Sequence, residues 1–355
     1  MFGIDIAKLR IDMGDEKNTT LACTALVGVG TLLLALRYLL HGLLGQISSV
    51  SVRGKHCLVT GGSSGIGKEV AKQLAREGAH ITIAARRQAG LDAALMEIEA
   101  CRESSTQMVQ TVSVDVGKPE DVERAMGEVV SRQGAVQVLA NCAGFAIAKE
   151  LDEMSMADFE RILRVNTLGS AFVTRALLPG MKASGGGRIL FTSSLLGQMG
   201  VYGYTAYCAS KFALVGMAQA LQMEVKAYGI GVSVAYPPDT DTPGFVTENK
   251  DKPAATSRIS EEGGIFTATQ VASKMVRGLQ SGDFCITFGS DGYLLALGTA
   301  GFAPCFSIFP AFAQVISASV LRAASFFYTW RFYGIAADEK RNKEALNVSG
   351  ARRSD

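Results

Sequence analysis

Apolar runs without clean alternation recur between residues 53 and 290, and amphipathic stretches separate them. The runs are rich in Val, Ile and Leu, which is typical of strands buried on both faces. They are His56–Thr60, His80–Ala85, Thr111–Val114, Val136–Asn141, Arg188–Thr192, Gly231–Ala235 and Phe284–Phe288. The stretches between them are helix-like, as in Pro119–Gln133, which begins with proline and two acidic residues. This alternation predicts an α/β fold with a doubly wound, parallel, seven-stranded sheet of the Rossmann type. Residues 237–264 read as a long irregular loop over that sheet.

An apolar segment also precedes the predicted domain. Residues 19–36 carry no charge, and as a helix they span about 27 Å, close to the thickness of a bilayer core. The 18 residues before them contain four acids, which disfavours a cleaved signal peptide. We therefore predict an N-terminal tail at 1–18, a transmembrane anchor at 19–45 and a catalytic domain at 53–290.

The C-terminal part of the chain is apolar as well, and residues 292–321 are uncharged. We expect a membrane-associated region at 291–334, in which Pro304 and Pro310 argue against one straight helix. A membrane-embedded hairpin, a kinked span and a dimerisation surface all remain open. The tail at 335–355 holds Lys340, Arg341, Lys343, Arg352 and Arg353, which predicts a cytosolic location. A cytosolic tail would leave the glycosylation sequon at Asn347 unused, whereas the sequon at Asn18 stays open.

Composition excludes several classes of function. The 35 Lys and Arg residues balance 33 Asp and Glu residues without a basic run, which disfavours nucleic acid as a partner. Seven scattered cysteines without a CxxC pair indicate a reducing compartment. The three histidines show no metal-ligand spacing, so we predict no metal site.

A glycine-rich turn follows the first predicted strand and opens a helix. Its spacing is GxxxGxG, and glycines at these positions allow a tight turn and close approach of phosphate to the backbone. The serines of the turn can donate hydrogen bonds to phosphate oxygens. The predicted phosphate-binding residues are Gly61, Ser63, Ser64, Gly65, Ile66 and Gly67.

Residues that follow the next strands indicate which dinucleotide is bound. The second strand ends in Arg86 and Arg87 rather than in an acid, and a guanidinium suits a 2′-phosphate, so NADPH is predicted over NADH. Asp115, followed by Val116, is placed either to reach the adenine or to cap its own loop.

The fourth strand ends at Asn141, and we expect its amide to tie neighbouring strands together. The backbone at Ala143 and Gly144 is expected to line the cofactor.

Tyr207 and Lys211 lie four residues apart, which puts a phenol and an ammonium on one face of a helix. An ordinary phenol has a pKa near 10, and a neighbouring ammonium stabilises its phenolate. In the reducing direction the phenol gives its proton to the developing alkoxide as hydride arrives. Ser193 and Ser194 end the fifth strand, and one of the two hydroxyls should face the substrate oxygen.

Together these motifs resemble the short-chain dehydrogenase/reductases. The turn at 60–67 matches the family's TGxxxGxG element, and Ser194, Tyr207 and Lys211 have the family's catalytic spacing, with Ser193 as the alternative serine. The resemblance implies that Asn166 holds a water in the proton relay.

The same resemblance implies that Thr242 contacts the nicotinamide carboxamide. One element departs from the family pattern, because Ala140 and Cys142 stand in the family's NNAG sequence.

Over residues 50–335 the chain is similar to a subgroup of that family, most specifically in its PPDTDTPGF element at 237–245. This resemblance implies NADPH-dependent reduction of the ketone of 3-ketodihydrosphingosine to dihydrosphingosine at the endoplasmic reticulum membrane, with the active site facing the cytosol. The residues alone predict a membrane-bound, NADP-dependent carbonyl reductase for an apolar substrate. Asp239 and Asp241 either pair with the ammonium of such a long-chain amino ketone or cap the loop that contains them.

Other interpretations stay open. A membrane-bound reductase of steroids, retinoids or 3-ketoacyl thioesters would use the same catalytic residues. A catalytically silent, cofactor-sensing scaffold predicts damage at Ser194, Tyr207, Lys211 or Asn166, and all four positions are filled. The apolar C-terminal run is also compatible with a membrane-tethered assembly subunit or a homo-oligomer interface.

Overall fold

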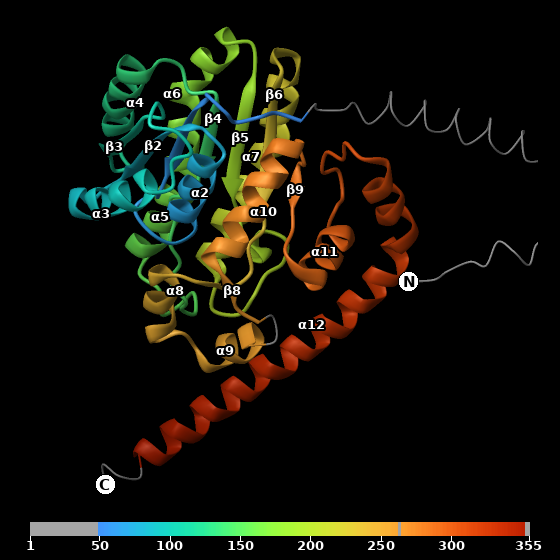
Figure 1. Ribbon diagram of the computed structural model, residues 1–355. Helices are drawn as coiled ribbons and strands as arrows, with labels where there is room; N and C mark the ends of the chain where they lie inside the picture. The colour runs from blue at the N-terminus through green and yellow to red at the C-terminus, as the bar shows by residue number, and fades with distance from the viewer. Residues whose placement is uncertain (1–48, 262–263, 352–355) are drawn as a thin grey trace, which may run out of the picture. The chain divides into compact units, whose positions relative to one another are not determined.

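The computed structural model describes residues 49–261 and 264–351 of the chain (Figure 1). The predicted tail and anchor at 1–18 and 19–45, including Asn18, lie outside the described residues.

Seven strands of the described part form one parallel sheet in the order β3-β2-β1-β4-β5-β6-β9. The strands are β1 (His56–Thr60), β2 (His80–Ala85), β3 (Val109–Ser113), β4 (Val138–Asn141), β5 (Gly187–Thr192), β6 (Ile230–Ala235) and β9 (Cys285–Ile286). The predicted doubly wound sheet is confirmed. Since all strands run the same way, their carboxyl ends collect at one edge, where α/β sheets bind their ligands.

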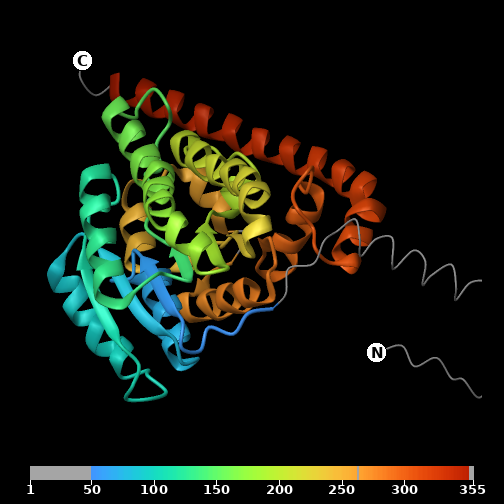
Figure 2. The ribbon, with the colours of Figure 1, turned by 90° about the horizontal axis from the view of Figure 1, so that it is seen from above.

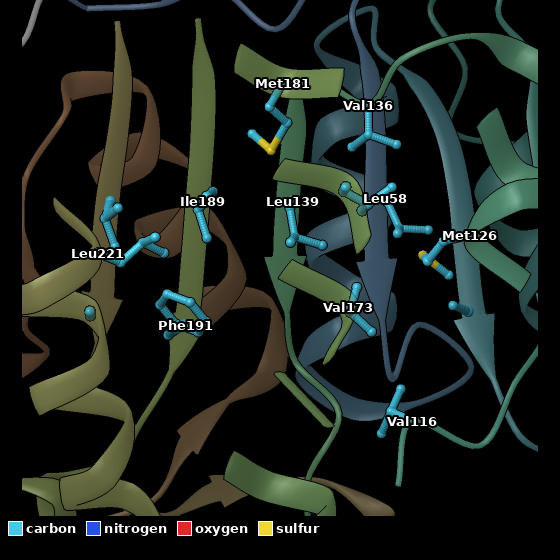
Figure 3. Packing of buried hydrophobic residues seen from close by; sticks show 14 of the residues in the cluster. Leu58, Val116, Met126, Val136, Leu139, Val173, Met181, Ile189, Phe191 and Leu221 are labelled. Carbon is cyan, nitrogen blue, oxygen red and sulfur yellow. The ribbon is translucent and has the colours of Figure 1, made fainter. Parts of the chain in front are cut away.

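Helices cover both faces of this sheet. On one face lie α4 (Pro119–Gln133), α6 (Gly169–Ala183) and α7 (Thr205–Val225). The other face carries α2 (Gly65–Arg76), α3 (Gln88–Glu99) and α10 (Ala268–Ser281). In β1, Leu58 packs into the first layer, whereas Cys57 and Val59 pack into the second, as the alternation of side chains along a strand requires. Figure 3 shows the first of these two layers.

The stretch expected to be irregular contains two short helices, α8 (Pro243–Glu248) and α9 (Ala254–Ser260). It also contains β7 (Thr240–Asp241), which pairs with β8 (Phe266–Thr267). The prediction was wrong there because it passed over a local helix start. The Thr242 side chain accepts a hydrogen bond from the Phe245 N–H, and Pro243 follows it at the first helical position.

The C-terminal region forms α11 (Gly289–Gly298) and a single helix of 44 residues, α12 (Ile308–Ala351). The expected interruption at Pro310 was wrong, because this proline lies in the first turn, where a missing N–H costs no hydrogen bond. Pro304 precedes the helix. The helix continues through residues 334 and 335, where we expected the apolar region to give way to the basic tail, and it passes beside α9 and α11 (Figures 1 and 2).

Candidate active site

Three of the predicted catalytic side chains meet at the carboxyl edge of the sheet. Ser194 follows β5, and its hydroxyl is hydrogen-bonded to the Tyr207 phenol in the first turn of α7. One turn further along, the Lys211 ammonium lies 5.4 Å from the centroid of the Tyr207 ring and donates to the Thr192 carbonyl at 2.8 Å. The spacing of four residues therefore places phenol and ammonium together, as predicted.

The surroundings of these groups set their protonation. Burial raises the pKa of the Tyr207 phenol, the negative charge of Glu248 raises it further, and the hydrogen bond with Ser194 lowers it. The phenol is thus protonated at neutral pH and can donate a proton. Burial also lowers the pKa of Lys211 from 10.5 to about 8, and the ammonium form still predominates at pH 7.

The two neighbouring serines have different surroundings. Ser193 is buried, and its hydroxyl donates to the backbone carbonyl of Lys211 at 3.0 Å. This contact ties the end of β5 to α7. The Ser194 hydroxyl accepts a hydrogen bond from the Leu196 N–H at 3.2 Å and lies against Tyr207. Geometry therefore favours Ser194 as the serine that faces a substrate oxygen.

Asn166 is fully buried in a single π-helical turn, Arg164–Leu168, that follows α5 (Met156–Leu163). Its amide donates to the Phe145 carbonyl at 2.9 Å and to the Ser210 hydroxyl at 3.0 Å, and its Oδ1 accepts from the Phe145 N–H at 3.0 Å. The side chain thus joins the segment after β4 to α7. A turn of this kind often marks a functional site, and the bound water expected at Asn166 stays a prediction.

The glycine-rich turn fits a dinucleotide pyrophosphate. Gly61 has a φ of +66°, and a Cβ there would lie 2.9 Å from backbone atoms of Ala143, so only glycine fits this close approach. Ser64 is the N-cap of α2, and its side chain makes no capping hydrogen bond. The first N–H groups of the helix are consequently left for an anionic ligand.

The other residues of the turn lie where such a ligand would need them. A Cβ at Gly65 would lie 3.1 Å from the Thr242 methyl group, so Thr242 and the turn approach each other closely. Ser63 would lie 3.5 Å from a Cβ at Gly90 of α3. Ile66 and Gly67 form the start of α2, and Gly67 is buried. Sequence reasoning named all these residues except Gly90.

Arg86 and Arg87 follow β2 directly, and both are exposed. Neither guanidinium forms an ion pair with another described residue, so both are free to meet an added phosphate group. The first turn of α3, which begins directly after Arg87, approaches Ser63 at Gly90. Their location at the same edge as the glycine-rich turn is what an NADP-binding arginine requires.

The two residues predicted to lie near the adenine, Asp115 and Val116, both have structural roles after β3. One oxygen of Asp115 accepts from the Gly117 N–H at 3.0 Å, which is the loop-capping role that we had left open. Val116 is buried in the core layer, where it lies against Gly169.

The end of β4 is attached differently from our expectation. The Asn141 amide donates to the Thr174 hydroxyl of α6 at 3.2 Å, so it joins its strand to a helix rather than to a neighbouring strand. The Thr60 hydroxyl at the end of β1 accepts instead from the N–H groups of Cys142 and Ala143, at 3.1 and 3.2 Å. Gly144 lies beside the catalytic groups, because a Cβ there would be 3.5 Å from the Lys211 ammonium.

Sequence reasoning missed a second group of polar residues at the site. The Tyr204 hydroxyl donates to the carboxylate of Glu248, and the rings of Tyr204 and Tyr207 lie 5.7 Å apart. The Lys252 ammonium is 4.0 Å from the same carboxylate. The only sequence signal was that Glu248 lies within the predicted loop at 237–264, which is weak because most acids in loops are solvated.

The two acids that we did single out are placed otherwise. Asp239 accepts a hydrogen bond from the Ser260 hydroxyl, and Asp241 is exposed in β7.

The comparison with known proteins agrees with this geometry. A family model described as short chain dehydrogenase matches residues 55–253, which contain the turn, the serine, the tyrosine and the lysine. The chain belongs to the short-chain dehydrogenase family. It is therefore an oxidoreductase that uses a nicotinamide cofactor.

Curated relatives of this short-chain dehydrogenase carry a more specific name. This chain is 44% identical to a 3-dehydrosphinganine reductase of Danio rerio and 43% identical to a 3-ketodihydrosphingosine reductase of Bos taurus. Each match covers 81% of this chain and 86% of the relative. A 3-ketodihydrosphingosine reductase of Dictyostelium discoideum is 38% identical over 71% of this chain and 80% of its own length.

The long C-terminal helix of this short-chain dehydrogenase is relevant to location. Residues 308–345 are long and apolar enough to cross a membrane, judged by length and composition. The rest of the described chain buries none of their most apolar window, which is compatible with membrane association.

Proposed function

We propose that this short-chain dehydrogenase reduces the ketone of 3-ketodihydrosphingosine to dihydrosphingosine in sphingolipid synthesis, with NADPH as the reductant. The substrate is inferred from the names of relatives that match most of the chain. The reaction is supported by one observation above all: the Tyr207 phenol is hydrogen-bonded to the Ser194 hydroxyl, and the Lys211 ammonium lies 5.4 Å from its ring centroid.

The proposed mechanism assigns each of these groups a role. The bound nicotinamide cofactor supplies the hydride. The Ser194 hydroxyl holds the ketone oxygen, and Tyr207 donates its proton to that oxygen as negative charge develops there. Lys211 stabilises the phenolate that remains, because its ammonium lies beside the ring. Asn166 would then hold the water through which Tyr207 regains a proton.

NADPH is preferred over NADH in this proposal because of the residues after β2. Arg86 and Arg87 would bind the 2′-phosphate, whereas the turn from Gly61 to Gly67 would hold the pyrophosphate at the start of α2. Thr242, beside Gly65, would contact the carboxamide.

We further propose that the chain is attached to the cytosolic face of the endoplasmic reticulum membrane. Large apolar side chains are exposed along α12 between residues 309 and 333, and an Arg322 charge among them disfavours a complete crossing. Both ends of this region would accordingly stay on the cytosolic side. The exposed residues are Phe309, Phe312, Val315, Ile316, Val320, Phe326, Phe327, Tyr328, Trp330 and Tyr333.

The proposed function is tested by following NADPH consumption by detergent-solubilised protein given 3-ketodihydrosphingosine, with NADH as the comparison. Tyr207→Phe should lower the rate by about 10²- to 10⁴-fold, the usual contribution of a general acid, and should still bind NADPH. If the wild-type chain binds NADPH but leaves this ketone unreduced, the substrate assignment is wrong, and steroid, retinoid and 3-ketoacyl ketones become the next substrates to assay.

A further inference from the structure

A carboxylate lies one aromatic ring away from the proton donor, on an element that sequence reasoning did not connect with catalysis. Glu248 is the last residue of α8, and its side chain is only 17% exposed. One of its oxygens, Oε1, accepts a hydrogen bond from the Tyr204 hydroxyl. The rings of Tyr204 and Tyr207 are 5.7 Å apart, so this hydrogen bond holds the carboxylate near the catalytic phenol, on which its charge acts.

This carboxylate retains hydrogen-bonding capacity. The Lys252 ammonium is 4.0 Å from Oε1, too far for a hydrogen bond. It is held elsewhere, because it donates to the Ser260 hydroxyl at 3.3 Å and lies 4.9 Å from the centroid of the Phe245 ring. The second oxygen of Glu248 accepts no hydrogen bond from any residue of 49–261 or 264–351. A poorly solvated carboxylate with a free oxygen is well suited to bind a cation.

In the absence of a bound cation, a negative charge at this position would hinder the reaction. After burial, the charge of Glu248 is the next largest cause of the raised pKa of Tyr207, so it opposes formation of the phenolate that remains after proton transfer. Burial in turn raises the pKa of the Glu248 carboxyl, whereas the Tyr204 hydrogen bond and the Lys252 charge lower it. A positive group brought in with the substrate would stabilise both anions.

We propose that Glu248 binds the ammonium group of an amino-ketone substrate and thereby selects 2-amino ketones over neutral ketones. This inference rests on the proposed function. In such a substrate the amino group is on the carbon next to the ketone. A ketone oxygen held by Ser194 and Tyr207 therefore brings the nitrogen close to the space that Tyr204 and Glu248 border.

Glu248 suits this role better than the two acids suggested by the sequence. The Asp239 carboxylate already accepts the Ser260 hydroxyl, and the exposed Asp241 is solvated, so an ion pair with it would contribute little. Asp251, which is exposed on the same loop three residues after Glu248, provides a matched control.

The test compares two ketones that differ only in the amino group: 3-ketodihydrosphingosine and the same chain without its amine. Glu248→Gln should raise KM for the amine about ten- to a hundredfold, the range expected for a lost charge-assisted hydrogen bond. The KM for the neutral ketone should change little. Asp251→Asn should leave both unchanged, and NADPH binding reports whether each variant is folded.

Three results would overturn the proposal. Equal losses for both ketones in Glu248→Gln would show that the residue only supports the local structure. An unchanged KM for the amine would exclude an ion pair with it. Failure of the wild-type chain to reduce either ketone, with NADPH bound, would remove the proposed function and this inference with it.

A measurement on the wild-type chain alone covers the case in which Glu248→Gln does not fold. Dihydrosphingosine should inhibit the reductase at least about tenfold more tightly than its N-acetyl derivative, because acetylation removes the charge that Glu248 binds. Equal inhibition by the two compounds would overturn the proposal without the use of any variant.

Discussion

At the scale of single residues, the site depends on how burial changes two pKa values in opposite directions. Burial keeps the proton on the Tyr207 phenol by raising its pKa, and it makes Lys211 an easier group to deprotonate by lowering its pKa to about 8. At pH 7 the pair consequently consists of a neutral phenol and an ammonium. This is the combination that a reductase needs before proton transfer.

The lowered pKa of Lys211 predicts how the rate of ketone reduction depends on pH. The ammonium is present below about pH 8 and is lost as the pH rises through that value, so its stabilisation of the phenolate is lost on the alkaline side. We expect kcat/KM for the ketone to fall above about pH 8, by up to tenfold per pH unit. In Lys211→Arg, whose guanidinium stays charged over this range, the residual rate should lack that decline. A flat wild-type profile up to about pH 10 would contradict the assignment of Lys211.

At the scale of elements, the site depends on the turn between β1 and α2, which must pass very close to the segment after β4. A Cβ at Gly61 would lie 2.9 Å from the Ala143 backbone, and the positive φ at this residue disfavours any side chain. The same turn exposes the N–H groups at the start of α2. Packing of the two segments and cofactor binding thus share one backbone geometry.

Gly61→Ala should therefore damage both stability and cofactor binding. We expect the free energy of unfolding to fall by about 2–4 kcal/mol, from left-handed backbone strain together with the steric overlap. The dissociation constant for NADPH should rise in the same variant. Thermal unfolding and NADPH fluorescence titration measure the two effects.

Gly127→Ala in α4 is the matched control. No atom lies within 4 Å of a Cβ at this helical position, so the change should raise stability by about 0.5–1 kcal/mol. Equal behaviour of the two variants would contradict the account of the turn.

At the scale of the whole molecule, α12 joins the apolar region to the catalytic domain. Its second half is attached near the active-site loops: Asp338 pairs with Arg258 at 3.3 Å, and Lys343 pairs with Glu153 at 3.0 Å. Ile335 packs against α9 through Ile259. The first half leaves its large apolar side chains exposed. A helix that binds a membrane at one end would in this way hold the substrate loop near the bilayer that contains the lipid.

This arrangement predicts the location of the C-terminus. A tag placed after Asp355 should be digested by protease added to sealed microsomes, because in this proposal α12 does not cross the bilayer and the tail is basic. A lumenal marker protein must survive the same treatment as the control. Protection of the tag would show instead that α12 crosses the bilayer.

Features that follow from short-range rules could be predicted from the amino-acid sequence. Strands buried on both faces have continuous apolar sequences, so the parallel sheet and all seven of its strands were predicted, with strand ends within about two residues of those observed. The Gly61 turn and the shared helical face of Tyr207 and Lys211 could also be predicted from the sequence, because each involves only a few neighbouring residues.

Contacts between residues far apart in the sequence could not be predicted in this way, because they depend on how the elements pack. Family spacing favoured Ser194 over Ser193, and strand geometry alone left both open. In the fold, the Ser193 hydroxyl donates to the Lys211 backbone carbonyl of α7, which leaves Ser194 for the substrate. Glu248 lies 44 residues from its partner Tyr204, and no periodicity in the chain connects them. The folding of α8 over the sheet brings that carboxylate to the catalytic phenol, because a loop's path depends on packing against distant elements rather than on its own residue pattern.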